Sequence, residues 1–329
     1  MRRIIEISFP ARLSIRRQQL LIRRDGKPDA QVPAEDISIL VVDHPAVTYS
    51  QAVFTTLAEK AGAIVLCGAD HKPAGAFLPL TANNLVSARQ GHQLAASKPL
   101  NKRLWKKIVQ AKIRQQGCVL AHFSLRDHGL EELARRVKVA DLGNLEAQAA
   151  QRYWPALLGP NFRRRRDGGP PNSLLNYGYT VLRAAVARAL TSSGLLATHG
   201  IYHRRRDNPF CLADDLMEPF RPYIDQRAVA LAPKGGWGDS LDQTAKAAVL
   251  GAFNDWVPIG DVHRPLSLAI HSSAASLARC FAEKHDQLSL PHGLARSEEN
   301  VPTTEEDKGR KNGADDTALL ADDVGSCLI

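Results

Sequence analysis

One glutamate in this 329-residue sequence stands where an apolar side chain is expected. Residues 144–154 read NLEAQAAQRYW, and at about 100° per residue along a helix Ala149 and Tyr153 fall on the same side as Glu146. That side should face the interior, where a carboxylate is costly unless a cation or a metal ion compensates it. Glu146 is therefore either a functional acid or a helix-start glutamate that meets the helix dipole or a core arginine.

A second group of acids follows His203 along the chain. Residues 212–222 read LADDLMEPFRP and place three acids within five positions. On a helix Asp215 and Glu218 share one face, apart from the apolar stripe. Because three neighbouring carboxylates repel one another, a nearby cation is expected. The acids either form a solvated face paired with Arg221 or bind a ligand, and His203 is either a structural histidine or a ligand as well.

Two runs of arginine lie between Glu146 and the second group of acids along the chain. The first falls in an expected loop between two helices, and the second directly follows His203. As plain surface runs they would keep the protein soluble, but two runs flanking the candidate site favour contacts with phosphates. Such contacts position a nucleic acid and make its affinity salt-sensitive without reading its sequence. The arginines are Arg163, Arg164, Arg165, Arg166, Arg204, Arg205 and Arg206.

The charge distribution also favours a polyanionic partner. The chain carries a net charge of +9, and the residues from 291 onward contain four basic and nine acidic side chains, which leaves +14 on residues 1–290. A body this basic favours nucleic acid over a membrane surface. The sequence has no Walker-type phosphate loop and no G-x-G-x-x-G, H-E-x-x-H or G-x-S-x-G motif. Nucleotide hydrolysis at a phosphate loop and serine-hydrolase chemistry therefore have no support.

The sequence leads us to expect a cytoplasmic protein. Its longest aliphatic runs are too short to span a bilayer, and the first residues, MRRIIE, lack the apolar core of a signal peptide. The cysteines are odd in number, scattered and never in a C-x-x-C pair, which argues against disulfides and a cysteine zinc site. They are Cys67, Cys118, Cys211, Cys280 and Cys327.

The elements that must position these residues change character along the chain. Short apolar clusters interleaved with arginines indicate strands in the first 80 residues, with one helix at 50–60. From residue 100 the apolar residues recur with a helical period. The expected strands are 4–7, 13–15, 20–22, 37–42 and 63–66, and the expected helices include 144–154 (capped by Asn144 and ended by Pro155), 173–190, 212–220, 245–253 and 266–283.

The predicted fold class is α+β, with a small β-rich N-terminal domain before a larger, mostly α-helical domain that carries the site. We expect the β-rich domain at residues 1–82, a linker at 83–100, the helical domain at 101–290 and a disordered acidic tail at 291–329.

Four sequence blocks together resemble the universal CRISPR adaptation endonuclease-integrase family, in the form found in type II CRISPR systems. They occur in the family's order with plausible gaps, and the resemblance covers roughly residues 1–285. Any one block alone would be a weak signal, whereas four are a strong one. The blocks are NLEAQAAQRYW (144–154), NSLLNYGY (172–179), GIYH (200–203) and ADDLMEPFRP (213–222).

The resemblance implies that Glu146, His203 and Glu218 are the ligands of a divalent metal ion, with Asp215 as a supporting acid. The D-x-x-E spacing leaves open whether Asp215 or Glu218 is the third ligand. Two carboxylates and one imidazole, without a thiolate, suit Mg²⁺ or Mn²⁺ better than a structural zinc. Such a cation can polarise a phosphodiester of DNA and offset charge on the leaving oxygen.

The activity that the resemblance implies is that of a metal-dependent DNA endonuclease and integrase. It would insert short foreign DNA into a CRISPR array by attack of a 3′-OH on a phosphodiester, a strand transfer that needs no ATP. The implied partners are double-stranded and branched DNA, a second copy of the chain bound largely through the N-terminal domain, and a small dimeric protein of the adaptation complex.

Three alternatives stay open. Tyr177, in the NSLLNYGY block, either stacks on a base or ribose of the DNA or packs in the helical core. The protein could be a non-catalytic DNA-binding scaffold in which the acids and His203 are structural. It could also be a metal-dependent repair nuclease that acts on branched DNA with the same site and no role in integration.

Overall fold

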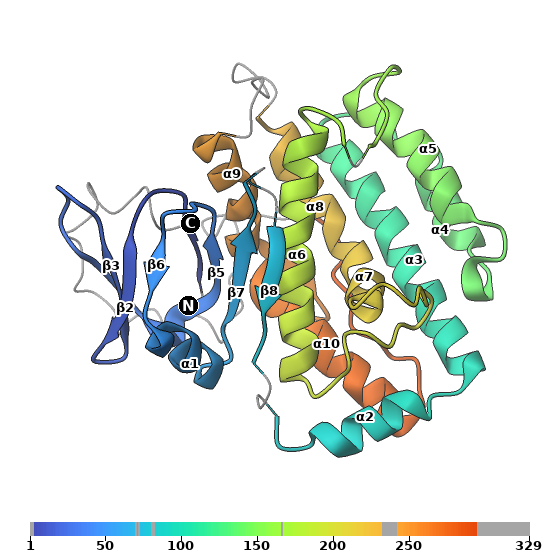
Figure 1. Cartoon of the computed structure of the whole chain (residues 1–329). Helices are drawn as coiled ribbons and strands as arrows, with labels where there is room; N and C mark the ends of the chain where they lie inside the picture. The colour runs from blue at the N-terminus through green and yellow to red at the C-terminus, as the bar shows by residue number, and fades with distance from the viewer. Residues whose placement is uncertain are drawn as a thin grey trace, which may run out of the picture.

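The first part of the chain forms two four-stranded sheets in the computed structural model, which describes residues 3–69, 71, 73–79, 83–165, 167–231 and 242–294 (Figure 1). In the first sheet, in the order β1-β5-β7-β8, the strands β1, β5 and β7 are parallel and β8 is antiparallel to β7. The second sheet has the order β4-β3-β2-β6. The strands are β1 (Arg3–Ile7), β2 (Arg12–Arg16), β3 (Gln19–Arg23), β4 (Ala30–Pro33), β5 (Ile37–Val42), β6 (Thr48–Tyr49), β7 (Ala63–Cys67) and β8 (Pro73–Phe77), and helix α1 (Gln51–Glu59) lies between β6 and β7.

The rest of the described chain is mostly helical, and α6 packs against β7 and β8 of the first sheet (Figure 1). Helix α3 begins where Ser97 accepts a hydrogen bond from the Leu100 N–H (3.3 Å) and Pro99 occupies the first turn, a typical helix start. The helices are α2 (Val86–Leu94), α3 (Lys98–His122), α4 (Leu130–Arg136), α5 (Leu145–Leu158), α6 (Asn172–Ser192), α7 (Cys211–Met217), α8 (Arg221–Val229), α9 (Gln243–Leu250) and α10 (Leu266–Glu283).

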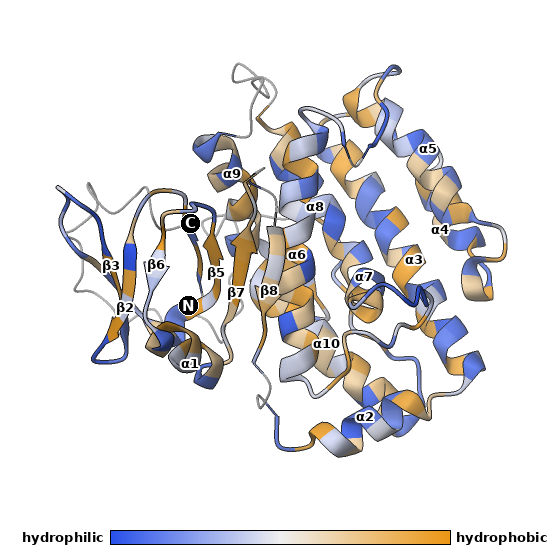
Figure 2. Ribbon diagram, in the orientation of Figure 1, coloured by the Kyte–Doolittle hydropathy of each residue, from blue (hydrophilic) through white to orange (hydrophobic). Residues whose placement is uncertain are grey.

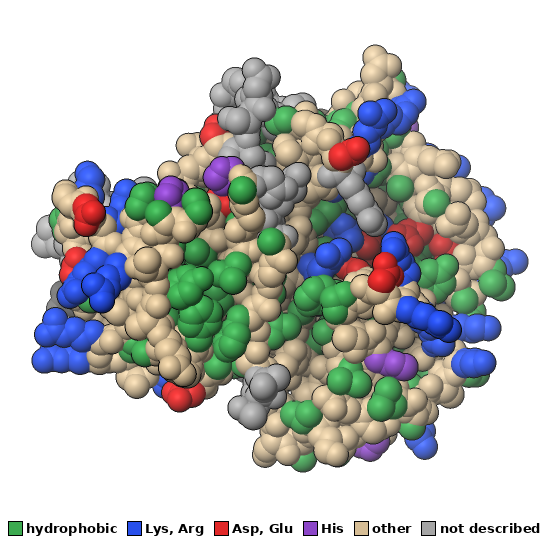
Figure 3. All heavy atoms as spheres, viewed as in Figure 1, with side chains coloured by type: hydrophobic (Ala, Val, Ile, Leu, Met, Phe, Trp, Pro, Cys, Tyr) green, Lys and Arg blue, Asp and Glu red, His purple; other side chains and the backbone are tan. Residues whose placement is uncertain are grey.

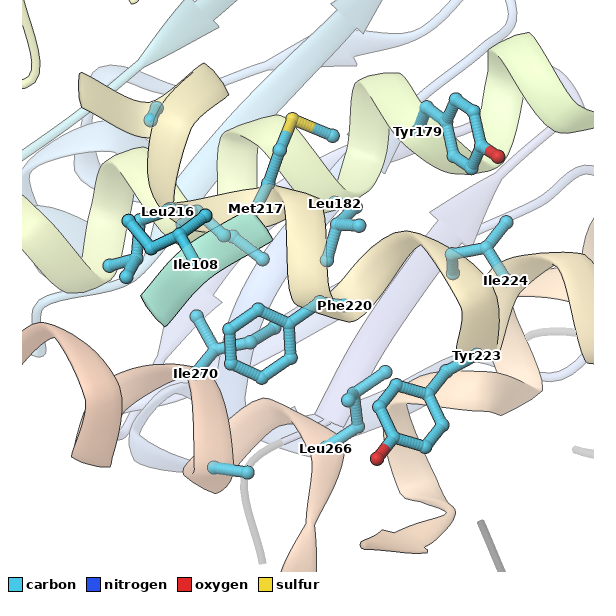
Figure 4. Close-up of a cluster of buried hydrophobic side chains, with 14 of the residues drawn as sticks. Ile108, Tyr179, Leu182, Leu216, Met217, Phe220, Tyr223, Ile224, Leu266 and Ile270 are labelled. Carbon is cyan, nitrogen blue, oxygen red and sulfur yellow. The ribbon is translucent and has the colours of Figure 1, made fainter. Parts of the chain in front are cut away.

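The first sheet contributes to two hydrophobic cores, because side chains alternate between the two faces of a strand. Ile39 and Val41 of β5 join the large core of the helices, whereas Leu40 and Val42 join a smaller core with the second sheet and α1. All six residues of β5 are buried, and β5 and β7 are among the most apolar ribbons of Figure 2. Figure 4 shows part of the large core, where Phe220 lies among side chains of several helices.

Gly178 permits a close contact between helices in this core. A Cβ atom at this position would lie 2.6 Å from Ile224 Cγ2 of α8 and 2.6 Å from Val249 Cγ1 of α9. The glycine in the NSLLNYGY block therefore lets α6 approach both helices.

The predicted α+β class, strand-rich first and helical after, is confirmed, and residues 266–283 form α10 within the expected bounds. The start and end of α5 differ from the prediction. Asn144 has a left-handed φ of 49° and makes no side-chain cap, because Asp141 accepts the N–H groups of Leu145 (2.9 Å) and Glu146 (3.1 Å) instead. The helix also continues through Pro155, although a proline inside a helix removes one N–H donor and crowds the preceding turn, and it ends at Leu158.

Other parts of the prediction missed elements or fall outside the described residues. The expected linker contains α2 and the first turn of α3, and the helical part contains an unexpected antiparallel hairpin. Of the expected tail, residues 295–329 lie outside the described residues. Within the described part of the chain, no helix is long and apolar enough to cross a membrane, and Cys67, Cys118, Cys211 and Cys280 are free. The hairpin is β9 (Trp256–Ile259) with β10 (Val262–Pro265).

Candidate active site

Two of the predicted metal ligands converge on one lysine. Glu146 is the second residue of α5, and Glu218 opens the short 3-10 turn that follows α7. Lys112, from the middle of α3, places its Nζ 2.6 Å from Glu146 Oε1 and 2.5 Å from Glu218 Oε2. Burial would lower the pKa of Lys112, but the charges of Glu218 and Glu146 outweigh burial and raise it. Three separate elements thus bring two carboxylates to a single ammonium group.

Glu218 is the more buried of the two carboxylates. Burial opposes its ionisation, but the positive charges of Arg221 and Lys112 prevail and lower its pKa to about 2. Arg221 Nε donates a hydrogen bond to Glu218 Oε1 at 2.9 Å, so the expected pairing with Arg221 is present. The other oxygen, Oε2, touches Lys112 as an ion pair but receives no aligned hydrogen bond. Glu218 is therefore a charged, buried carboxylate, and its Oε2 atom accepts no well-aligned hydrogen bond.

Asp215 lies behind His203 and fixes it. Its buried carboxylate accepts hydrogen bonds from the backbone N–H groups of Ile201 (2.6 Å), Tyr202 (2.9 Å) and His203 (3.1 Å). The Nδ1 atom of His203 lies 2.6 Å from Asp215 Oδ1, and this hydrogen bond raises the pKa of His203. Burial raises the pKa of Asp215, although the hydrogen bonds from His203 and Tyr202 oppose it. Asp215 thus orients the imidazole and leaves Nε2 as the outward ring nitrogen.

Gly200 is required at the start of this loop. A Cβ atom there would lie 2.2 Å from the backbone oxygen of His203 and 2.9 Å from Asp215 Oδ2. With any larger residue at this position, the loop could not close around the carboxylate of Asp215. The backbone oxygen of His203 cannot move aside as the end of a flexible side chain can.

Each of the neighbouring acids has its own cationic or polar partner. Asp214 lies 2.7 Å from Arg183 Nε of α6 and accepts a hydrogen bond from Asn208 Nδ2 at 2.7 Å. The expected compensation of the three acids is therefore present. The interpretation of a solvated acidic face does not hold for Asp215 and Glu218, since both are buried.

A buried aspartate ties together the helices that carry the site. Asp225 of α8 accepts hydrogen bonds from Tyr153 of α5 (2.9 Å) and from Tyr179 of α6. Burial raises its pKa to about 6, although the two tyrosine hydrogen bonds oppose the shift. Because Tyr153 lies two turns after Glu146 on α5, this contact fixes the helix face from which Glu146 projects.

A cavity of about 290 Å³ opens beside Glu218 and Lys112, and much of its wall is basic or aromatic. Arg164 is held at the wall by hydrogen bonds to Asn172 Oδ1 (3.0 Å) and Asn176 Oδ1 (2.7 Å), with its guanidinium 5.0 Å from the centre of the Tyr179 ring. Figure 3 shows acidic and basic side chains gathered on this face, over α3, α6 and α7. The wall includes Lys112, Trp154, Arg164, Arg165, Glu218 and Arg221.

The two arginine runs are placed differently. Arg163 and Arg165 are exposed, and Arg165 borders the cavity, while Arg166 lies outside the described residues. The second run, Arg204–Arg206, is exposed directly after His203, and Arg205 pairs on the surface with Asp207 (2.9 Å).

The stacking role considered for Tyr177 has to be given up. Its side chain is 1% exposed, and its hydroxyl donates to Glu6 Oε1 of β1 at 3.0 Å. Lys246 Nζ lies 5.4 Å from the centre of the ring. Tyr177 joins α6 to the first sheet and presents no ring face to DNA, in agreement with the alternative of core packing.

The donor set fits a hard divalent cation. The described residues contain no group of three or more His, Cys, Asp or Glu side chains placed to hold a metal ion as they stand, and Lys112 lies between two of the predicted ligands. Yet carboxylates and one imidazole are ligand types that suit Mg²⁺ and Mn²⁺. In addition, the buried Oε2 atom of Glu218 accepts no well-aligned hydrogen bond. The nearby thiol of Cys211 is engaged by the backbone oxygens of Arg205 and Asn208.

Sequence reasoning missed Lys112, although a signal was available. On a helix Lys112 lies one turn after Ile108 and one turn before Gln116, close to the face that carries the buried residues of α3. A lysine on such a face predicts a buried acidic partner, just as Glu146 on an inward face predicted a cation.

These features define a class of protein. The molecule is an α+β protein in which two carboxylates meet at one lysine beside a basic cavity that Glu218 lines, and a buried aspartate orients a histidine close by in the sequence.

A comparison with known families places the chain within one of them. The family model described as CRISPR associated protein Cas1 matches residues 6–251. The CRISPR-associated endonuclease Cas1 of Neisseria meningitidis serogroup C (strain 8013) is 35% identical over 299 residues, which cover 90% of this chain and 98% of the relative. The chain belongs to the Cas1 family, and the resemblance found in the sequence is confirmed.

Solved structures share the fold at lower identity. A casposase bound to an integration product matches with a TM-score of 0.72 and 19% identity, covering 95% of this chain and 99% of the other. A chain of a Cas6-RT-Cas1–Cas2 complex matches with a TM-score of 0.66 and 20% identity, covering 87% of this chain and 35% of the other.

Proposed function

We propose that this chain is a metal-dependent DNA endonuclease and strand-transfer integrase of CRISPR adaptation, with Glu146, His203 and Glu218 as ligands of Mg²⁺ or Mn²⁺. Two of the similar proteins support the activity: the Neisseria relative is named an endonuclease, and the casposase is bound to an integration product. The observation that carries the proposal is the convergence of Glu146 and Glu218 on one cation position beside a basic cavity.

Glu218 rather than Asp215 is the third ligand in this proposal. Both oxygens of Asp215 are engaged by three backbone N–H groups and His203, so binding a metal would break the loop that holds the histidine. Glu218 has an oxygen without an aligned donor. Asp215 is then the supporting acid that keeps Nε2 of His203 available as a donor.

A bound Mg²⁺ or Mn²⁺ supplies Lewis-acid chemistry, polarising a phosphodiester and offsetting charge on its leaving oxygen. The protein positions the DNA: Arg165 and the fixed Arg164 lie at the cavity wall, and Arg204–Arg206 lie after His203, where phosphates can contact them. A DNA 3′-OH attacks the phosphorus, the new ester bond forms as the old one breaks, and the released 3′-OH takes the proton. One phosphodiester replaces another, so no nucleotide hydrolysis is needed.

The proposed partners are double-stranded and branched DNA, a second copy of the chain, and a small dimeric protein of the adaptation complex. The structural match to a chain of a Cas6-RT-Cas1–Cas2 complex supports the last of these, with Cas2 as the protein concerned. The contact between the two copies is assigned to the N-terminal domain predicted from the sequence, residues 1–82. Sedimentation measurements of the oligomeric state, with exposed side chains of these strands altered, would test that assignment.

The test of the activity uses a labelled branched DNA with a free 3′-OH, incubated with Mn²⁺, Mg²⁺ or EDTA. We expect strand joining by the wild type and by His92→Ala, an exposed histidine of α2, and loss of joining in His203→Ala and in EDTA. Cleavage without joining would favour a repair nuclease. DNA binding without chemistry in any metal, by a folded protein, would refute the proposal in favour of a scaffold.

A further inference from the structure

Lys112 occupies the point where the two proposed metal-ligand carboxylates meet. Its Nζ lies 2.6 Å from Glu146 Oε1 and 2.5 Å from Glu218 Oε2, and its side chain is 13% exposed. An ammonium group and a divalent cation that use the same oxygens repel each other, and the repulsion is strong where water is largely excluded. Lys112 and the metal ion therefore compete for these two carboxylates.

The pattern of partners argues against a purely structural ion pair. Glu218 already has a well-aligned hydrogen bond from Arg221 at 2.9 Å, so Lys112 is its second cationic partner. Within the described ranges, Lys112 is the cation that contacts the carboxylate of Glu146. Lys112 thus joins Glu146, for which it is the contacting cation, to Glu218, which also pairs with Arg221. It keeps the two carboxylates close together.

We propose that Lys112 is a positioning residue that holds Glu146 and Glu218 together when no metal ion is bound and releases them when one binds. The inference rests on the proposed function, since it takes both acids as ligands. Lys112 therefore lowers the affinity of the site for the free ion, at the same time as it prevents the two carboxylates from driving each other apart.

The released ammonium has a place to go. Lys112 also lines the basic cavity, together with Gln116 one turn further along α3 and the arginines Arg164, Arg165 and Arg221. A DNA phosphate in this cavity would compensate the charge of the displaced lysine. Metal and DNA should therefore bind cooperatively in the wild type, because each favours the released position of Lys112.

The experiment measures Mn²⁺ binding to the full chain by calorimetry, without DNA and then with a branched duplex. Lys112→Met removes the competing charge, and Lys102→Met, an exposed lysine on the same helix, removes the same charge away from the site. We expect Lys112→Met to bind Mn²⁺ about tenfold more tightly than the wild type, a change of about 1.4 kcal/mol. Lys102→Met should match the wild type, and added DNA should tighten Mn²⁺ binding in the wild type more than in Lys112→Met.

Two further variants keep the outcomes distinct. Lys112→Gln retains a hydrogen-bond donor without the charge and replaces Lys112→Met if that protein aggregates. Unfolding of either variant in EDTA that Mn²⁺ reverses would support the proposal. Equal or weaker Mn²⁺ binding by a folded Lys112→Met or Lys112→Gln would overturn it. If the wild type binds no Mn²⁺, or if Glu146→Gln binds as well as the wild type, the proposed ligand set itself fails.

Discussion

Replacing Asp215 by asparagine should both destabilise the protein and disable the site. The carboxylate accepts three backbone N–H groups and the imidazole of His203, whereas an amide has one oxygen and turns an NH₂ group toward donors that need an acceptor. A buried donor left without an acceptor costs about 1–3 kcal/mol, so one or two donors left unpaired lower the free energy of unfolding by about 3 kcal/mol. With the histidine no longer oriented, we also expect strand joining to fall by about 10- to 100-fold.

The matched control is Asp214→Asn, one residue earlier on the same helix. Asp214 pairs with Arg183 and Asn208 at a position where its side chain is 14% exposed, and we expect a loss of about 1 kcal/mol or less. Urea denaturation followed by circular dichroism gives the free energies, and the branched-DNA assay gives the activities. If Asp215→Asn unfolds at the same urea concentration as Asp214→Asn and joins DNA at the wild-type rate, Asp215 does not hold the loop.

Three other perturbations test the fold and the DNA surface. Burial raises the pKa of Glu6 to about 6, so the contribution of Glu6 to stability is complete below about pH 4.5 and is lost as the pH rises through 6. The wild type should therefore lose about 1–2 kcal/mol of unfolding free energy over this range. The urea midpoint of Glu6→Gln should not show this loss. Gly178→Ala should lower the free energy of unfolding by about 1–3 kcal/mol because the added methyl group overpacks the core. Gly91→Ala in α2, which has open space around it, should raise it by about 1 kcal/mol. Equal unfolding midpoints of the two variants would contradict the close contact at Gly178. Arg165→Ala should reduce the salt dependence of DNA affinity, measured by fluorescence anisotropy, by about one phosphate contact. Arg23→Ala, at the end of β3 where Arg23 pairs with Asp29, should leave this salt dependence unchanged.

The acids of the site were predictable from the sequence because they violate a local pattern. Glu146 falls on the buried side of its helix, and Asp215 and Glu218 lie among residues that pack. A carboxylate in such a place needs a partner, and the need is visible without the structure. The identity of the partner is not, because Lys112 is 34 residues away from Glu146 and meets it only through the packing of α3 against α5.

Local signals failed where a distant residue or a neighbouring element decided the outcome. Asn144 has the residue type of a helix cap, but Asp141, three residues earlier, takes the N–H groups. The hairpin of β9 and β10 is two four-residue strands inside a helical region, too short for a strand period to stand out. Tyr177 is buried where its hydroxyl meets Glu6, a partner 171 residues away in the chain.

The two faces of β5 link the two hydrophobic cores, and this has a consequence for how the protein unfolds. Ile39 and Val41 belong to the core of the helices and Leu40 and Val42 to the core of the strands, so neither core can come apart without exposing one face of the same strand. We expect a single cooperative unfolding unit that spans both halves of the chain, with the β5 amides among the slowest to exchange with deuterium. Excising the helical half at residue 101 would leave the sheet-facing side of its core open to water, and the fragment should aggregate rather than fold.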